Sequence, residues 1–156
     1  AYIATYGRDA AGEKTFRPES RTWEQFTFTN KIFGSTQLSN RFRLEQRYMG
    51  ESAEDANNSY FSQRLRYFIR GVVPFKKDSV FSKGVFLALQ NEVFVNIQNK
   101  EKVNNHFFDQ NRAYIAVGYR INKKVDIEAG YMNQYTKAIT GGTTNNILQV
   151  VLYTRL

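Results

Sequence analysis

Apolar and polar residues alternate over the ten positions from Arg112 to Ile121. The aliphatic and aromatic members of one set are Ala113, Ile115, Val117, Tyr119 and Ile121. The other set contains charged residues, small residues and one tyrosine: Arg112, Tyr114, Ala116, Gly118 and Arg120. Since successive side chains of a strand point to opposite faces, this period of two predicts a β-strand.

The next segment, from Val125 to Tyr135, continues the alternation. The two segments agree in phase if residues 122–124 form the turn, which places Arg120 opposite Asp126 and Ile121 opposite Val125. An earlier hairpin follows the same logic. Its turn is expected at residues 34–36, and the expected cross-strand pairs are Phe26 with Leu44, Phe28 with Phe42, and Ile32 with Leu38.

Eight strand segments are expected, including a short first one at residues 1–7, and their connections alternate in length. Long connections are expected at 8–21, 50–59, 97–106 and 137–145, short ones at 34–36 and 122–124, and an intermediate one at 74–83. Outer-membrane barrels have short turns at one end and long loops at the other. We therefore predict a single all-β domain over residues 1–156, an antiparallel up-and-down transmembrane β-barrel. The first strand is shorter than the roughly 9–11 residues of a membrane strand, so we expect it to be incomplete at its N-terminus, with a signal peptide removed.

Composition agrees with a barrel and argues against a membrane helix. Hydrophobic residues make up 42%, the mean hydropathy is −0.54, and no apolar run approaches the length of a membrane-spanning helix. The mean hydropathy of barrel strands is near neutral, because apolar and polar residues alternate along them. Aromatic residues reach 15%, which suits strands and interfacial girdles, and cysteine is absent.

The net charge of +8 is spread in a way that does not indicate nucleic-acid binding, because the basic residues do not gather on one exposed face. Lysines occur mostly in predicted turns, whereas arginines and carboxylates occur inside strands on the polar face. The predicted charge network of the lumen consists of Arg41, Arg43, Glu45, Arg47, Arg64, Arg66, Arg70, Glu92, Arg112, Arg120, Asp126 and Glu128. Two interpretations remain open: a membrane barrel that encloses these charges, and a soluble, lipocalin-like barrel that turns them to water. Arginine in place of lysine, carboxylates on adjacent strands, and small residues among them favour enclosure.

Five polar in-strand motifs follow one another along the chain: FRLEQR at 42–47, QRLRY at 63–67, LQNEVF at 89–94, FDQNR at 108–112 and EAGYMNQY at 128–135. They resemble motifs of a family of Bacteroidota outer-membrane proteins of unknown function that are predicted to be β-barrels. The resemblance runs from about residue 22 to residue 156. It implies a longer N-terminus and ten or more strands in the full-length protein, and it implies no activity.

Candidate chemistry is sparse. His106 could in principle combine with Ser59 or Ser62 and Asp109 as in a lipid hydrolase, but a solvated loop histidine is the simpler interpretation. Asp109, Asn111, Arg112, Glu92 and Asn91 could form a polar cluster at the outer end of the lumen. Glu51, Glu54 and Asp55 form an acidic loop without the spacing of a calcium site. We predict no catalytic residues, no metal and no cofactor.

The function expected from the sequence is that of a non-enzymatic outer-membrane β-barrel with a charged, largely filled lumen. It would act structurally or as an accessory subunit of an envelope complex. Its expected partners are outer-membrane lipid and other envelope proteins. The alternatives are a narrow channel for small solutes and an outer-membrane lipid hydrolase that uses His106.

Overall fold

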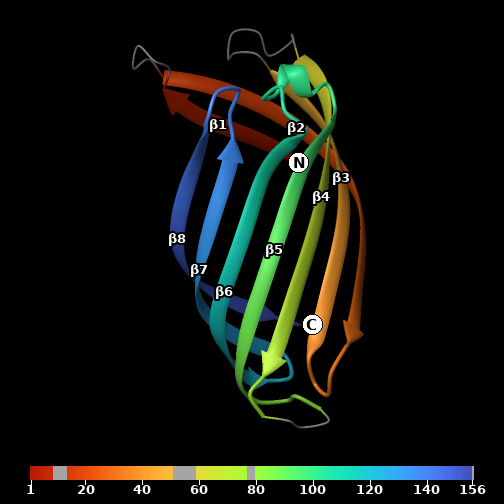
Figure 1. The fold of residues 1–156 in the computed structure, drawn as a ribbon, viewed down its shortest axis with the longest axis vertical. Helices are drawn as coiled ribbons and strands as arrows, with labels where there is room; N and C mark the ends of the chain where they lie inside the picture. Colours follow the sequence, from red (N-terminus) through yellow and green to blue (C-terminus); the bar gives the residue numbers. More distant parts are fainter. Residues whose placement is uncertain (9–13, 51–58, 77–79, 156) are drawn as a thin grey trace.

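The structure is a computed structural model that describes residues 1–8, 14–50, 59–76 and 80–155. Eight strands form one antiparallel sheet in chain order, and the sheet curls into a half-barrel (Figure 1). The strands are β1 (Tyr2–Arg8), β2 (Lys14–Lys31), β3 (Gln37–Gly50), β4 (Ser59–Pro74), β5 (Gly84–Gln98), β6 (Phe108–Asn122), β7 (Val125–Lys137) and β8 (Gly142–Thr154). A 3-10 turn, η1 (Lys100–Lys102), lies between β5 and β6. The prediction of an all-β up-and-down meander is confirmed.

β1 and β8 are the two edges of the sheet, and each pairs with one neighbour in the described chain. The β2–β3, β4–β5 and β6–β7 connections lie at the lower end in Figure 1. We call this the turn end, and we call the opposite end, where η1 and the β7–β8 connection lie, the loop end. No helix in the described residues is long and apolar enough to cross a membrane.

Two of the predicted connections have wrong boundaries. The connection expected at residues 8–21 is shorter, because β2 already begins at Lys14 and pairs Pro18 with Ala4. Likewise, β8 begins at Gly142 within the connection expected at 137–145. Proline is rare inside strands because it lacks an N–H donor, so Pro18 made this segment look like a loop. Pro18 lies where β2 pairs with the short edge strand β1.

The β2–β3 hairpin is shifted by two residues from the predicted register. Phe26 lies opposite Phe42, and Phe28 lies opposite Asn40. The loop is centred on Gly34, whose φ of +56° is readily adopted by glycine, and Thr36 N–H donates to the Phe33 carbonyl at 2.9 Å. A shift of two residues keeps every side chain on its face, so alternation alone could not choose between these registers.

The β6–β7 hairpin matches the prediction at Arg120, which lies opposite Asp126. One residue further, the register shifts, and Asn122 rather than Ile121 pairs with Val125. The Asn122 side chain accepts hydrogen bonds from the N–H groups of Lys124 and Val125, at 2.8 and 3.1 Å. This local capping of the turn explains the irregularity, because an asparagine side chain can replace a backbone acceptor.

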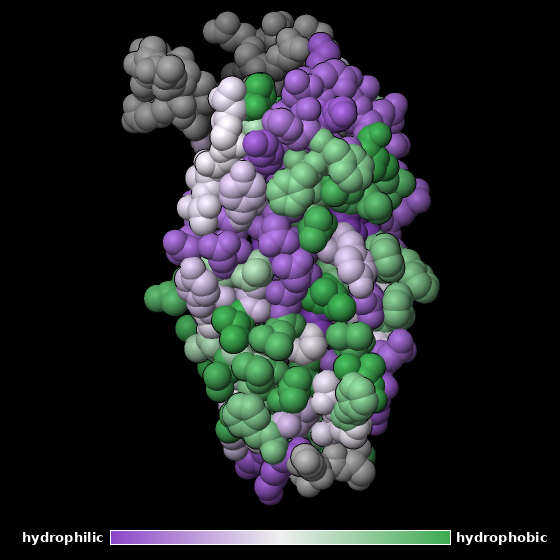
Figure 2. All heavy atoms as spheres, viewed as in Figure 1, coloured by the Kyte–Doolittle hydropathy of each residue, from purple (hydrophilic) through white to green (hydrophobic). Residues whose placement is uncertain are grey.

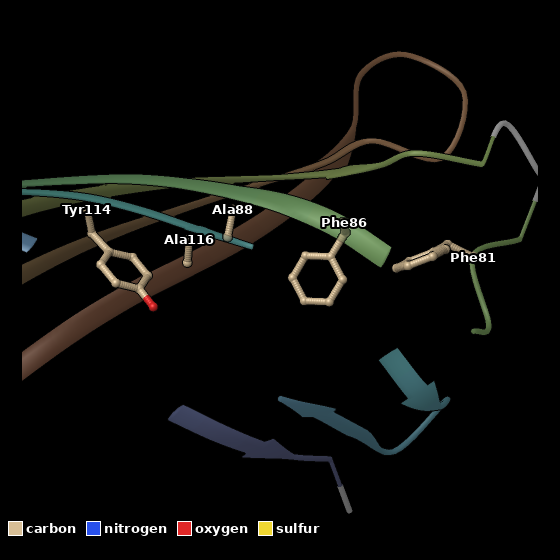
Figure 3. Packing of buried hydrophobic residues seen from close by; sticks show 5 residues of the cluster. All are labelled: Phe81, Phe86, Ala88, Tyr114 and Ala116. Carbon is tan, nitrogen blue, oxygen red and sulfur yellow. The ribbon is translucent and has the colours of Figure 1, made fainter. Parts of the chain in front are cut away.

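Apolar side chains fill the interior near the turn end. Phe81, Phe86, Ala88, Tyr114 and Ala116 form the buried cluster. Figure 3 shows these side chains projecting from β5, β6 and the β4–β5 connection to the same side of the sheet. Phe81 packs edge-on against Phe86, with ring centroids 5.9 Å apart and an interplanar angle of 80°. The aromatic rings occupy the space that the small neighbours leave free.

Gly118 is one of those small neighbours, and a Cβ atom there would overlap the Phe86 ring and the Glu128 side chain. We expect Gly118→Ala to lower the free energy of unfolding by about 1–3 kcal/mol, because the packed interior has no room for a methyl group. Urea unfolding measures this. Gly71→Ala is the matched control, since a Cβ atom at Gly71 meets nothing within 4 Å. An equal loss in both variants would contradict the packing described for the interior.

Candidate functional site

The concave side of the sheet buries charge, while the convex side exposes apolar residues. Glu45 is 0% exposed, whereas Ile115 and Val117 are 49% and 55% exposed. On β6, the exposed and buried residues alternate along most of the strand. Figure 2 shows apolar residues covering much of the lower half of the visible face, with hydrophilic residues concentrated toward the loop end. The candidate site is therefore the charged concave interior.

Glu45 on β3 is the centre of the network in the loop-end half of this interior. Its Oε2 accepts from Arg64 Nε at 2.8 Å, and its Oε1 accepts from Arg66 Nη1 at 2.7 Å. Arg21 Nη1 lies 3.4 Å from Oε1. Glu45 and Arg64 are direct cross-strand partners, and Arg66 lies two residues along the same face of β4. A carboxylate removed from water in this way needs such charge-assisted hydrogen bonds to offset its desolvation.

Glu92 on β5 is the second acceptor and extends the network across the curled sheet. Arg66 Nη2 and Arg41 Nη2 lie 2.7 and 2.9 Å from its Oε1. Arg112 Nη1 is 4.0 Å from its Oε2. Because Arg66 contacts both Glu45 and Glu92, the two acceptors belong to one connected cluster.

Two carboxylates that the sequence analysis did not place in the network complete it. Glu19 pairs with Arg47 at 2.8 Å and with Arg21 at 2.7 Å. Asp109 accepts from Arg64 Nη1 at 2.8 Å. Glu19 and Arg21 were missed because they fell inside the predicted connection at 8–21. Their spacing of two residues, in phase with Trp23, was the signal for a longer strand.

Charged residues near the turn end form two smaller groups, one around Asp126 and one around Glu128. Arg120 contacts Asp126 through two hydrogen bonds, of 2.8 and 2.9 Å, in the bidentate geometry that guanidinium and carboxylate favour. Arg155 also contacts Asp126, and Arg70 contacts Glu128. The sequence analysis did not include Arg155.

Aromatic rings inside the half-barrel support the guanidinium groups. The guanidinium carbons of Arg64, Arg66 and Arg112 lie 5.1, 4.5 and 4.9 Å from the centroid of the Phe94 ring. Arg41 stacks on Phe68 at 4.5 Å. Such contacts stabilise a cation by the negative potential of the ring face. These phenylalanines interrupt the polar pattern of their strands, yet they lie on the charged face.

Arg43 differs from the other predicted network residues, because no described carboxylate pairs with it. Its Nε and Nη2 donate to Gln25 Oε1 at 3.1 and 2.8 Å, and its guanidinium lies 5.5 Å from the Trp23 ring centroid. It also lies directly opposite another cation, Arg66. The cationic side chain is held by neutral partners.

The polar cluster expected around Asp109 is divided between the two faces of the sheet. Arg112 and Glu92 approach each other in the interior, and Asp109 turns to Arg64. Asn91 and Asn111 instead pair on the convex face, where each amide donates to the other at 3.4 and 3.1 Å. The expected single cluster is wrong, because Asn91 and Glu92, like Asn111 and Arg112, are neighbours along a strand and point to opposite faces. The register shift between Phe94 and Val95 lies beyond them, next to Asp109.

Candidate hydrolase residues do not hydrogen-bond to one another within the described chain. The His106 ring Nε2 lies 3.2 Å from the Ile139 carbonyl oxygen. The Ser62 hydroxyl donates to the Gln98 carbonyl at 3.2 Å, and Asp109 is held by Arg64 and Asn104. Ser59 is exposed at the start of β4. The hydrolase hypothesis therefore gains no geometric support from these contacts.

The described residues contain no group of three or more His, Cys, Asp or Glu side chains that could hold a metal ion. Glu51, Glu54 and Asp55, the acidic loop considered above, lie outside the described residues.

The convex face carries a groove of about 460 Å³ in its apolar surface. Leu38, Ile69, Leu89 and Ile115 are among the aliphatic residues that line it. Asn91 and Asn133 also line it, and with Asn40 and Asn146 they lie in one cross-strand row. Some of these amides are satisfied locally: Asn133 donates to Asn146 at 2.9 Å, and the Tyr67 hydroxyl donates to Asn40 at 2.8 Å. Polar groups on this face thus pair among themselves.

Replacing Glu45 tests how strongly the interior depends on charge pairing. We expect Glu45→Gln to lower the free energy of unfolding by roughly 3–5 kcal/mol, because it leaves buried arginines without their carboxylate. The measurement is urea unfolding. Glu24→Gln on the exposed part of β2 makes the same chemical change and should stay within about 0.5 kcal/mol of the parent. A Glu45→Gln protein as stable as the parent would show that the pairs add no net stability.

Comparisons with known proteins identify a family and leave its activity open. No curated protein matches the chain, and no solved structure matches it. The family model described as "Protein of unknown function (DUF2490)" matches residues 2–146. Since the match covers nearly the whole chain, the protein belongs to the DUF2490 family of proteins of unknown function.

Proposed function

We propose that this protein is a non-enzymatic β-barrel of the bacterial outer membrane with a charged, largely filled lumen. The observation that carries the proposal is the inverted distribution of side chains. In a soluble barrel the apolar face would be buried and the charged face exposed. Here Ile115, Val117 and Ile127 are exposed, while Glu45 and Glu128 are buried. Hydrocarbon on the convex side accounts for this arrangement, because it makes outward aliphatic side chains favourable.

Strand length supports the proposal. β2 to β8 contain 13 to 18 residues each, more than the roughly 9–11 needed to cross a bilayer. β8 presents Leu148, Val150 and Leu152 outward, and Leu148 is 85% exposed. The resemblance of several in-strand motifs to those of Bacteroidota outer-membrane proteins favours the same location.

The two sheet edges set a requirement for the membrane form. Unpaired backbone N–H and C=O groups are costly in hydrocarbon, so β1 and β8 need partner strands there. We propose that further strands close the barrel, giving ten or more in the full-length protein, as the family resemblance implies.

The convex groove supports a role as an accessory subunit. The amides of this row pair with groups on the same face, but each amide has two N–H donors and an oxygen with two lone pairs, so the row retains hydrogen-bonding capacity toward a partner that aliphatic lipid chains cannot use. We propose that another envelope protein packs over the groove near Asn91 and Asn133. The partner could contribute both apolar contacts and hydrogen bonds.

Membrane insertion should depend on the convex aliphatic side chains. We expect the full-length protein, the parent of the variants below, to fold into lipid vesicles, float with them in a density gradient and migrate differently on a gel before and after heating. Val117→Arg should reduce the inserted fraction, since a cation at a lipid-facing position costs about 2–4 kcal/mol near the bilayer midplane. Thr154→Arg lies on the same face at the turn end and should insert nearly as well. Failure of the parent protein to float with vesicles would overturn the proposed location.

The filled turn end should also prevent ions from passing through the interior. Phe81, Phe86 and Tyr114 occupy the interior beside the Arg120–Asp126 pair. We therefore expect no stepwise conductance when the inserted protein is studied in planar lipid bilayers. Reproducible single-channel steps, absent from a mock preparation, would instead favour the narrow-channel alternative.

A further inference from the structure

Among the residues that the structure describes, positive charge exceeds negative charge in the loop-end half of the interior. The described arginines there are Arg21, Arg41, Arg43, Arg47, Arg64, Arg66 and Arg112. The described carboxylates that pair with them are Glu19, Glu45, Glu92 and Asp109. Seven cations therefore face four anions, an excess of three. A partly desolvated excess of cations attracts an anion, because the interior screens charge less than water does.

Some of these guanidinium groups retain unused donors. Arg41 Nε, Arg47 Nη1 and Arg112 Nε are buried and have no hydrogen-bond partner among the described residues. The Arg47 side chain is 9% exposed, so water has little access to it. Buried donors of this kind are costly unless something accepts from them.

Three incompletely paired arginines lie around Glu92. Arg41 and Arg112 both contact Glu92, the latter at 4.0 Å. Arg43 lies two residues from Arg41 on the same face of β3, and it faces Arg66 across the β3–β4 pair. Glu92 neutralises one of these charges and also bonds to Arg66, so a net positive charge remains around it.

On the β2 side of the half-barrel, this region is open to the interior space. Trp23 and Gln25, which contact Arg43, are exposed, and the side chains of Arg41 and Arg112 retain 25% and 34% exposure. The turn end, in contrast, is filled by the cluster around Phe86. A solute that enters would be held at the arginines and not passed through.

We propose that Arg41, Arg43 and Arg112 form a binding site for a small oxyanion, a phosphate or a carboxylate. Guanidinium groups match the oxygen geometry of these anions and donate to two oxygens at once. Gln25 holds Arg43 through a neutral amide, which an anion can replace as acceptor without breaking an ion pair. The site goes beyond the proposed function and does not depend on the membrane location.

Calorimetric titration of the folded full chain with inorganic phosphate, at constant ionic strength and in detergent if required, tests the site. We expect saturable binding of one phosphate. Arg43→Gln should weaken it by about tenfold, the effect of losing one charge-assisted hydrogen bond. Lys124→Gln removes the same charge from the exposed β6–β7 turn and should leave the affinity unchanged. Arg43→Gln should shift the midpoint of urea unfolding only slightly, because it loses the hydrogen bonds to Gln25 but leaves no described carboxylate without its partner.

Two further measurements complete the test. Arg112→Gln provides a second variant that should also weaken phosphate binding, and it decides the matter if Arg43→Gln does not fold. A short-chain phosphate monoester lipid, titrated in detergent, distinguishes a lipid headgroup from a free oxyanion as the natural ligand. If this lipid binds more tightly than inorganic phosphate, the ligand is a lipid headgroup. If the two bind equally, the ligand is a free oxyanion. The absence of saturable phosphate binding by the parent protein, or equal losses in Arg43→Gln and Lys124→Gln, would overturn the proposal. Neither result would bear on vesicle insertion.

Discussion

The enclosure of paired charges behind an apolar outer surface is the constraint on which the rest of the structure depends. Glu45 has no exposed surface, and its desolvation is offset by Arg64 and Arg66, which reach it from the neighbouring strand. Those arginines are themselves placed by the β3–β4 register. A shift by one residue would exchange the two faces, so charge pairing and aliphatic exposure specify the same register.

Packing and electrostatics divide the interior into two halves. Near the turn end, small residues such as Ala116 and Gly118 make room for Phe86, and the charges form two small groups. Toward the loop end, long arginine side chains replace that packing and share carboxylates across several strands. Phe94 supports three of these arginines as a stacking surface. The packed side chains of the turn-end half fill the interior there. The loop-end half provides the surplus of hydrogen-bond donors from which we infer an anion site.

Alternation along β6 and β7 was enough to predict the fold class and the Arg120–Asp126 pair, because a period of two determines faces directly. It could not choose the β2–β3 register, where turn geometry at Gly34 decides between two arrangements with the same faces. Pro18 concealed the first part of β2 and, with it, the contribution of Glu19 to the network. Asn91 and Asn111 were expected in the lumen because they are polar, yet they pair with each other on the convex face. The type of a residue indicates that its polar group needs a hydrogen-bond partner, but the face of the sheet to which the side chain points depends on the strand register.

The central claim, that the convex face of the sheet meets hydrocarbon, can be measured residue by residue. The chain contains no cysteine, so single cysteines at the odd positions from 113 to 121, and at the exposed turn positions 123 and 124, can each carry a spin label without background. In lipid vesicles, the account predicts that labels at the odd positions from 113 to 121 collide with dissolved oxygen and are shielded from a water-soluble nickel chelate, whereas the chelate reaches labels at 123 and 124. Access of the chelate to the odd positions from 113 to 121 in the vesicle-bound protein would contradict the account.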